Sequence, residues 1–209
     1  MFVTLEGIDA SGKSTQLELL KRALKERGFD VLATRQPGGT PIGRQIREVI
    51  LSPVNSEMVA ETEVLLYMAD RLQHLCQVVR PALDKGKIVL CDRYHDATVV
   101  YQGAGRRLDL SWLRPIEKKY LIRPDLTLWL DISLEESLDR LERRNRQQGI
   151  ENCRLESEDR EFFKRVVAKY RELCEKESDR FVRIAAEENS DTIQKSILAA
   201  LMPKLKENG

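Results

Sequence analysis

Short apolar runs alternate along this chain with longer segments of helical periodicity, and this alternation limits its possible folds more than any other feature. Strands joined by crossover helices form parallel sheets that are covered on both faces, so each strand is mostly apolar. Five runs, at residues 2–6, 31–34, 87–91, 126–131 and 181–184, are short and rich in Val, Leu, Ile or Phe. They predict an α/β protein with a five-stranded parallel sheet.

Helical segments fill the intervals between these runs. Over residues 13–25, three leucines recur at spacings of three and four, and Gly28 gives a stop signal before the second strand. Pro41 opens another helix, and a longer one is predicted over about 57–83 with a bend or break near Pro81. Two core-facing stripes lie near the C-terminus: Phe162, Val166, Tyr170 and Leu173, then Ile193, Ile197, Leu198 and Leu201.

Length and charge narrow the class of protein. The 209 residues suit one domain, 1–209, with helices and sheet in three layers. Lys and Arg total 35 against 34 acidic residues, so no global field favours nucleic acid or an anionic membrane as partner. We find no run long enough for a bilayer span or an N-terminal signal. Four scattered cysteines and two histidines outside metal-binding patterns indicate a cytoplasmic protein with reduced thiols and no histidine-held metal.

Residues 7–14 read Gly-Ile-Asp-Ala-Ser-Gly-Lys-Ser, which fits the pattern GxxxxGK[ST] between a predicted strand and a predicted helix. Glycines at both ends allow successive N–H groups to point at phosphate oxygens, and the following helix adds its positive end. The lysine would bridge the β and γ phosphates, and the last serine would ligate Mg²⁺. The alternative is a chance match in a glycine turn. The pattern predicts ATP binding through Gly7, Ile8, Asp9, Ala10, Ser11, Gly12, Lys13, Ser14 and Thr15.

The third predicted strand is followed by Asp92 and Arg93. A carboxylate at the carboxyl end of a buried strand can hold Mg²⁺ or its waters, and a guanidinium can fork onto phosphate. A surface ion pair at a strand end is the alternative. We therefore expect Ser14 and Asp92 to hold the metal and Lys13, Asp92 and Arg93 to serve catalysis.

Further segments resemble the thymidylate kinase family in order and spacing: EGID at 6–9, DRY at 92–94, YQG at 101–103 and RPDL at 123–126. The stretch TRQPGGT at 34–40 is similar to the bacterial family's TREPGGT. The resemblance covers nearly the whole chain. It implies a P-loop kinase fold with a mobile lid, and transfer of the γ phosphoryl of ATP to thymidine monophosphate with Mg²⁺. It also implies a homodimer.

The resemblance assigns residues to the acceptor nucleotide. Tyr67 would stack on thymine and Arg71 would bond its carbonyl, although a tyrosine and an arginine four apart on a helix are also typical of a packed surface pair. Arg47 and Arg93 match arginines at the acceptor phosphate, with Arg35 as a third candidate. A solvated charge on an amphipathic helix is the alternative for Arg47. The implied acceptor-binding residues are Arg35, Pro37, Arg47, Tyr67, Arg71, Arg93, Thr98, Tyr101 and Gln102.

Three of these matches carry more specific roles. Tyr101 would crowd the ribose 2′ position, which implies a preference for deoxyribose, and Gln102 would meet the base edge. Thr98 would line the same nucleoside pocket. Asp9 matches a carboxylate near the acceptor's sugar and the metal, which makes it a further candidate metal ligand and catalytic residue. The alternative for Asp9 is a cap on the following helix.

Residues of about 144–158 resemble the family's lid, which would close over ATP and exclude water. Some family members carry a P-loop arginine where this chain has Ala10, and those without it use a lid arginine. Arg154 is our first candidate for that catalytic, ATP-contacting role, and Arg144 is the second. The alternative is that the arginines near this stretch only form i,i+4 ion pairs on a solvated helix.

Two residues depart from the family pattern: Gln36 replaces a glutamate and Ala97 replaces a serine. Gln36 keeps an acceptor but loses a charge, which puts in doubt any role of position 36 as a metal-linked carboxylate or helper base. Three other functions stay open: a kinase of another nucleoside monophosphate, a regulatory nucleotide-binding P-loop protein and, despite the neutral charge balance, a nucleic-acid-dependent ATPase.

Overall fold

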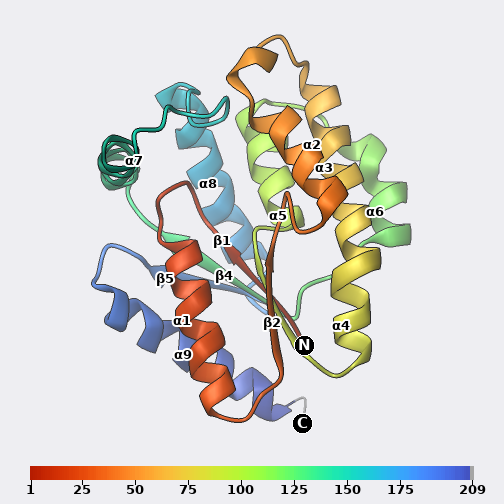
Figure 1. Cartoon of the computed structure of the whole chain (residues 1–209), viewed down its shortest axis with the longest axis vertical. Coiled ribbons are helices and arrows are strands. Elements are labelled where there is room, and N and C mark those ends of the chain that lie inside the picture. The colour runs from red at the N-terminus through yellow and green to blue at the C-terminus, as the bar shows by residue number, and fades with distance from the viewer. Residues whose placement is uncertain (208–209) are drawn as a thin grey trace.

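A parallel sheet of five strands forms the centre of the computed structural model, which describes residues 1–207 (Figure 1). The strands lie in the order β2-β3-β1-β4-β5, and each neighbouring pair is parallel. The predicted α/β fold class is confirmed, and each strand bound agrees with the prediction to within one residue. The strands are β1 (Phe2–Glu6), β2 (Val31–Arg35), β3 (Ile88–Asp92), β4 (Leu126–Asp131) and β5 (Phe181–Ala185).

Helices cover both faces of the sheet, so that every residue of β1 is buried. Figure 1 shows α1 and α9 on one side and α8, α5 and α4 on the other. Within residues 1–207, every helix falls short of the length and apolarity that a bilayer span demands. The helices are α1 (Lys13–Glu26), α2 (Pro41–Leu51), α3 (Ala60–His74), α4 (Arg80–Asp84), α5 (His95–Thr98), α6 (Arg114–Tyr120), α7 (Leu134–Gln148), α8 (Arg160–Lys176) and α9 (Ser190–Glu207).

The long helix predicted over 57–83 is interrupted close to Pro81, as expected. It begins at Ala60, and a π-helical segment, Leu75–Val79, separates α3 from α4. The amide of Arg80 donates to the carbonyl oxygen of Leu75, five residues back, and the next residue is a proline, which has no N–H to donate. Both predicted C-terminal stripes face the core, although Leu198 is only partly buried.

The carboxyl ends of β1, β2 and β3 meet at one edge of the sheet. Leu5 and Arg35 both lie beside Asp92 in the strand register. The pairing continues past the strands, because the amide of Arg93 donates to Leu5 O at 2.9 Å and the amide of Gln36 donates to Asp92 O at 2.9 Å. The glycine-rich turn, the Asp-Arg pair and the TRQPGGT stretch therefore converge, as the edge of a parallel sheet predicts.

Candidate active site

The turn between β1 and α1 folds into a loop that its own lysine closes. Gly7 has a φ of 142° and Gly12 a φ of 94°, and a Cβ on Gly7 would also lie 2.7 Å from the carbonyl oxygen of Leu130. The buried Lys13 ammonium donates to two carbonyl oxygens of the loop, at 3.0 and 2.7 Å. Burial and then the positive charge of Arg93 lower the pKa of Lys13 to about 8. Phosphate oxygens in this loop would favour the charged ammonium.

Ser14 and Asp92 connect this loop to the end of β3. The Ser14 hydroxyl donates to Asp92 Oδ2 at 3.0 Å, while Asp92 Oδ1 is buried without a partner among residues 1–207. Within the same residues, no group of three or more His, Cys, Asp or Glu side chains could hold a metal. Mg²⁺ in nucleotide sites takes one or two carboxylates and completes its shell with phosphate oxygens and water. A hydroxyl beside an unpaired carboxylate oxygen fits that ion.

Asp9 forms an ion pair with Arg93 and does not cap α1. The guanidinium of Arg93 lies 2.6 Å from Asp9 Oδ1 and also donates to the carbonyl oxygen of Gly7 at 2.9 Å. Gly12 is the N-cap residue of α1, with no side-chain cap bond, so the capping alternative for Asp9 is wrong. Burial alone would raise the pKa of Asp9, but Arg93 and then Lys13 lower it. Arg93 keeps a left-handed φ of 66°, which places its side chain over the loop.

Two cavities adjoin each other at this edge of the sheet. The first, the loop cavity, is lined by Asp9, Ala10, Gly12, Lys13, Ser14, Thr15, Arg35, Gln36, Arg47, Asp92, Arg93, Arg140, Arg144 and Glu156. The second, the inner cavity, is lined by Asp9, Gln36, Pro37, Arg47, Leu51, Tyr67, Arg71, Arg93, Tyr94, Ala97, Thr98, Tyr101, Gln102, Cys153, Leu155 and Glu156. Five residues line both cavities: Asp9, Gln36, Arg47, Arg93 and Glu156. The two cavities therefore share one wall, which carries two arginines.

The inner cavity holds buried polar atoms that have no partner in the protein. The hydroxyls of Thr98 and Tyr101 are buried and unpaired within residues 1–207. Unpaired buried groups are rare and costly, so they indicate a ligand that would satisfy them. Arg71 is also buried, and its guanidinium donates to Gln36 Oε1 at 3.0 Å and to the carbonyl oxygen of Tyr94 at 2.8 Å. Rigid donors and unpaired hydroxyls suit recognition of a polar planar group.

Gln36, the departure from the family pattern, positions Arg71. Arginine can only donate, so Gln36 Oε1 accepts, and the Gln36 amide NH₂ must face His74 Nδ1 at 2.7 Å. His74 Nδ1 therefore accepts, and His74 Nε2–H donates to the hydroxyl of Thr34 at 2.6 Å. Burial and then Arg71 lower the pKa of His74 to about 4, which agrees with a neutral ring. At position 36 this protein therefore has a neutral amide that links Arg71 to His74 by hydrogen bonds, where the family pattern has a charged glutamate.

The predicted lid arginines separate into two environments. Arg144 lines the loop cavity, where its guanidinium lies 2.8 Å from Glu156 Oε1. Arg154 is absent from both cavity walls, because its guanidinium is buried against Glu63 and donates to the carbonyl oxygen of Ile50 at 2.9 Å. Of the two candidates, only Arg144 therefore lines the loop cavity in this structure. Of the predicted lid, residues 144–148 are the last residues of α7, and 149–158 are irregular.

Sequence reasoning assigned no role to three charged residues of this region. Arg140 lines the loop cavity, and Glu156 lines both cavities. Glu63 lies behind the inner cavity, fully buried. Arg140 was identifiable only as one of several arginines near the lid. For Glu156 and Glu63, no motif distinguished them from ordinary helix or loop carboxylates.

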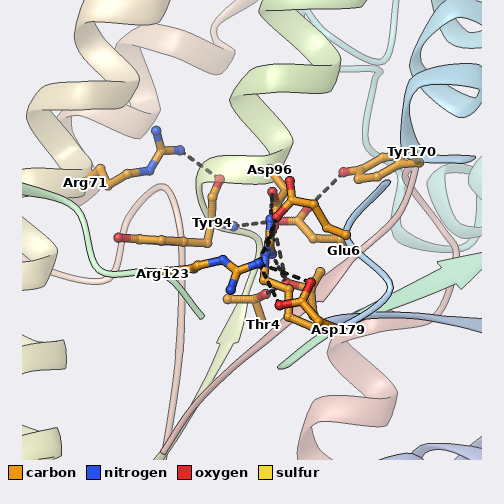
Figure 2. Close-up of polar contacts among 11 residues, drawn as sticks. Thr4, Glu6, Arg71, Tyr94, Asp96, Arg123, Tyr170 and Asp179 are labelled. Atoms are coloured by element: carbon orange, nitrogen blue, oxygen red, sulfur yellow. Dashed lines mark hydrogen bonds and ion pairs between the residues drawn. The ribbon is translucent and has the colours of Figure 1, made fainter. Parts of the chain in front are cut away.

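A buried polar layer lies beneath the site and was also missed (Figure 2). Glu6, the last residue of β1, accepts from the amide of Tyr94 at 2.7 Å and from the hydroxyl of Tyr170 at 2.8 Å. Burial and then the charge of Asp96 raise the pKa of Glu6 to about 7. Arg180 holds Asp96 through two hydrogen bonds of 2.8 Å. A carboxylate that ends an apolar strand was the one available signal for this layer.

The family of the chain is decided by comparison with known proteins. A family model described as thymidylate kinase matches residues 5–197. The chain belongs to the thymidylate kinase family. A curated thymidylate kinase from Exiguobacterium sp. is 43% identical to this chain over 211 residues, which cover 100% of this chain and 97% of the relative. A curated thymidylate kinase from Halothermothrix orenii is 44% identical over 199 residues, which cover 94% of each chain. The crystal structure of thymidylate kinase from Ehrlichia chaffeensis matches with a TM-score of 0.76, 27% identity and coverage of 97% of this chain and 98% of that chain.

Family membership confirms the resemblance and the predicted P-loop kinase fold. The thymidylate kinase relatives are covered almost from end to end, so the similarity does not stop at the phosphate-binding loop. The chain is accordingly a phosphotransferase. A regulatory P-loop protein and a nucleic-acid-dependent ATPase are not favoured by these comparisons.

Proposed function

We propose that this protein transfers the γ phosphoryl group of ATP to thymidine monophosphate, which gives thymidine diphosphate for dTTP synthesis. The observation that carries the proposal is the pair of cavities with a shared wall of arginines. The loop cavity would take the polyphosphate of ATP, with Lys13 and the backbone of residues 7–15 around it. The inner cavity would take the acceptor, so that the two phosphates meet at the shared wall.

Mg²⁺ would bind at Ser14 and Asp92, with Asp9 nearby. The ion would supply charge neutralisation for the leaving phosphate. The Ser14 hydroxyl and the unpaired Asp92 Oδ1 support this placement. The protein's own contribution is to hold Arg93 between Asp9 and the loop, from where its remaining N–H groups can reach a transferring phosphoryl.

The acceptor nucleotide would lie with its base between Tyr67 and Arg71 and its edge against Gln102. Tyr101 and Thr98 would face the sugar of this nucleotide, and Pro37 would also contact the nucleotide. Its phosphate would be held by three arginines, Arg35, Arg47 and Arg93. The position of Arg47 supports a role at the acceptor phosphate better than the alternative of a solvated charge on a helix. Its side chain lines both cavities and donates to the carbonyl oxygen of Pro37 at 3.1 Å.

Catalysis would depend on positioning and charge, without a covalent intermediate. Residues 144–158 would act as a lid that excludes water, and Arg144, which already lines the loop cavity, is our proposed lid cation. Arg154 would need to leave Glu63 first.

We further propose that residues 1–209 act as one kinase domain, in a cytoplasmic homodimer. Exposed apolar side chains on α2 and α3, among them Ile42, Val49 and Leu65, are compatible with a helix-packed interface. Sedimentation that gives a monomer at assay concentrations would contradict the dimer.

The function is tested by acceptor-dependent ADP release across thymidine, uridine, cytidine and guanosine monophosphates. We expect thymidine monophosphate to be preferred, and Lys13→Ala to lower kcat by roughly 10²-fold or more, because the γ phosphoryl charge loses its bridging ammonium. Lys21→Ala, on the same helix but outside both cavities, is the matched control.

Two outcomes would contradict the proposal. A preference for another monophosphate would make the protein a different nucleotide kinase. ADP release that no acceptor stimulates would indicate a nucleotide-binding regulatory protein. Activity that survives in Lys13→Ala would point to a contaminating kinase.

A further inference from the structure

A fully buried carboxylate, that of Glu63, stands behind the inner cavity. Its two oxygens accept from three side chains: Gln102 Nε2 at 2.6 Å, Arg106 Nε at 2.8 Å and the guanidinium of Arg154. These partners come from the π-helical segment Val99–Gly105, the residue that follows it and the irregular part of the lid. None of the roles assigned above includes Glu63.

Two arginines keep this carboxylate ionised. Burial by itself would raise the pKa of Glu63, but the hydrogen bond and charge of Arg106, with help from Gln102 and Arg154, lower it. Arg106 is in turn held by Glu158 at 2.8 Å. At neutral pH the Glu63 carboxylate therefore has no proton to donate, and it can only accept hydrogen bonds.

An acceptor-only neighbour settles which way the Gln102 amide points. Its NH₂ must face Glu63, and its carbonyl oxygen must point away from Glu63. Among residues 1–207, the bond to Glu63 is the single hydrogen bond of the Gln102 side chain, so Oε1 stays available to a ligand of the inner cavity that Gln102 lines.

Glu63 lies behind the wall that would face the base, where it accepts from Gln102, a residue of that wall. It precedes Tyr67 by four residues and Arg71 by eight on α3, so the three share one helix face. On that wall Arg71 can only donate and Gln102 Oε1 can only accept. Thymine and uracil present carbonyl oxygens on either side of N3–H, whereas cytosine presents an amino group and an unprotonated N3.

We propose that Glu63 is a positioning residue for base selectivity: by holding the Gln102 amide, it turns Oε1 toward the base and makes the site accept N3–H of thymine or uracil and reject cytosine. The proposal rests on the proposed function, because it takes the inner cavity as the acceptor site. It predicts discrimination at one edge of the base, and it leaves the methyl group and sugar to other residues.

The test is Glu63→Gln, measured as kcat/KM with thymidine, deoxyuridine and deoxycytidine monophosphates. An amide at position 63 can donate as well as accept, so Gln102 is no longer held in one orientation. We expect the ratio of thymidine to deoxycytidine monophosphate to fall roughly tenfold, mainly through KM. The ratio of thymidine to deoxyuridine monophosphate should stay the same, because the two bases present the same edge. General damage to the fold would not separate these ratios.

Three variants act as controls. Glu61→Gln removes an exposed carboxylate from the same helix and should keep both ratios. Arg154→Gln removes one partner of Glu63 but leaves the bond to Gln102, and it should also keep the deoxycytidine ratio. Gln102→Met should lower that ratio, and adding Glu63→Gln to it should produce no further fall. If Glu63→Gln does not fold, Glu63→Asp replaces it, since the shorter carboxylate withdraws from Gln102, and the same fall is expected.

Each result decides between distinct failures. Wild-type protein that does not phosphorylate thymidine monophosphate would overturn the proposed function. Wild-type activity with an unchanged deoxycytidine ratio in the Glu63 variant would overturn only the present inference. An equal fall in Arg154→Gln would also overturn it, because the effect would then come from the ion-pair cluster and not from the Gln102 amide.

Discussion

Two glycines of the phosphate-binding loop require glycine for different reasons. Gly12 has a left-handed φ, but a Cβ there would meet no atom within 4 Å. Gly7 has both a positive φ and a crowded site, where a Cβ would lie 2.7 Å from the backbone oxygen of Leu130. That oxygen belongs to β4 and cannot move without the sheet.

Alanine at these two positions should therefore have unequal effects. We expect Gly12→Ala to cost about 1 kcal/mol of unfolding free energy through backbone strain, and Gly7→Ala to cost at least about 2 kcal/mol because β4 must also yield. Urea unfolding of both variants beside the wild type measures the difference. Equal costs would mean that the loop moves away from β4 as easily as it bends.

The motif residues could be predicted from the sequence because their chemistry is local. Lys13, Ser14 and Gly7 belong to one short pattern, and the register of neighbouring parallel strands brings Asp92 beside them. The contacts of Arg154 could not be predicted, for the opposite reason. Its partner, Glu63, is 91 residues away, and nothing in either segment indicates that they meet.

At the scale of elements, Glu6 connects β1 to α8 and to the turn after β3. Tyr170 donates to one of its oxygens and the amide of Tyr94 to the other. A glutamine could replace both contacts, because its oxygen would accept from Tyr94 while its NH₂ donated to the tyrosine hydroxyl.

Glu6→Gln should consequently change how stability depends on pH. The pKa of Glu6 is about 7 in the folded state against an ordinary 4.5, so the folded state binds the proton more tightly. The stability from Glu6 is complete below pH 4.5 and is lost as the pH rises through 7. Between pH 5 and pH 8 we expect the free energy of unfolding of the variant to fall by roughly 2 kcal/mol less than that of the wild type.

Chemical denaturation across that pH range provides the measurement. Glu175→Gln, an exposed change on α8, is the matched control and should follow the wild type. Parallel curves for Glu6→Gln and wild type would mean that Glu6 ionises in the folded chain as easily as in the unfolded chain.

Strands and long helices could be predicted, but the helical stretch from His95 to Gly105 was missed. Its sequence has adjacent valines and two glycines, which local propensity disfavours in helices. Packing decides the matter: a Cβ on Gly105 would lie 2.5 Å from the ring of Phe162 in α8, so this glycine permits close contact between the two elements. Such a contact is visible only when both partners are in place.

At the scale of the whole molecule, His74 should contribute to acid sensitivity. Its pKa of about 4 in the folded state lies below the ordinary 6.5, so the unfolded state binds the proton first as the pH falls. The stability is complete above pH 6.5 and decreases toward pH 4. When the pH is lowered from 7 to 5, we expect the free energy of unfolding of His74→Gln to fall by about 2 kcal/mol less than that of the wild type.

Thermal or urea unfolding at several pH values tests this expectation. The internal control is the slope of stability against pH near pH 8, which should be the same in both proteins because His74 is almost entirely neutral there in both states. Identical slopes below pH 6 would show that the imidazole is protonated in the folded protein without penalty.

The polar layer under the active site has a consequence for engineering. Thr4, Asp96, Thr127, Tyr170 and Arg180, with Glu6, come from strands, helices and connections spread over nearly the whole chain. A phosphate-binding loop transplanted into another scaffold would lack this buried polar layer. The transplant would carry the recognisable motif but would lack Glu6's hold on Tyr94, whose carbonyl oxygen accepts from Arg71, so the smallest portable unit is close to the complete protein.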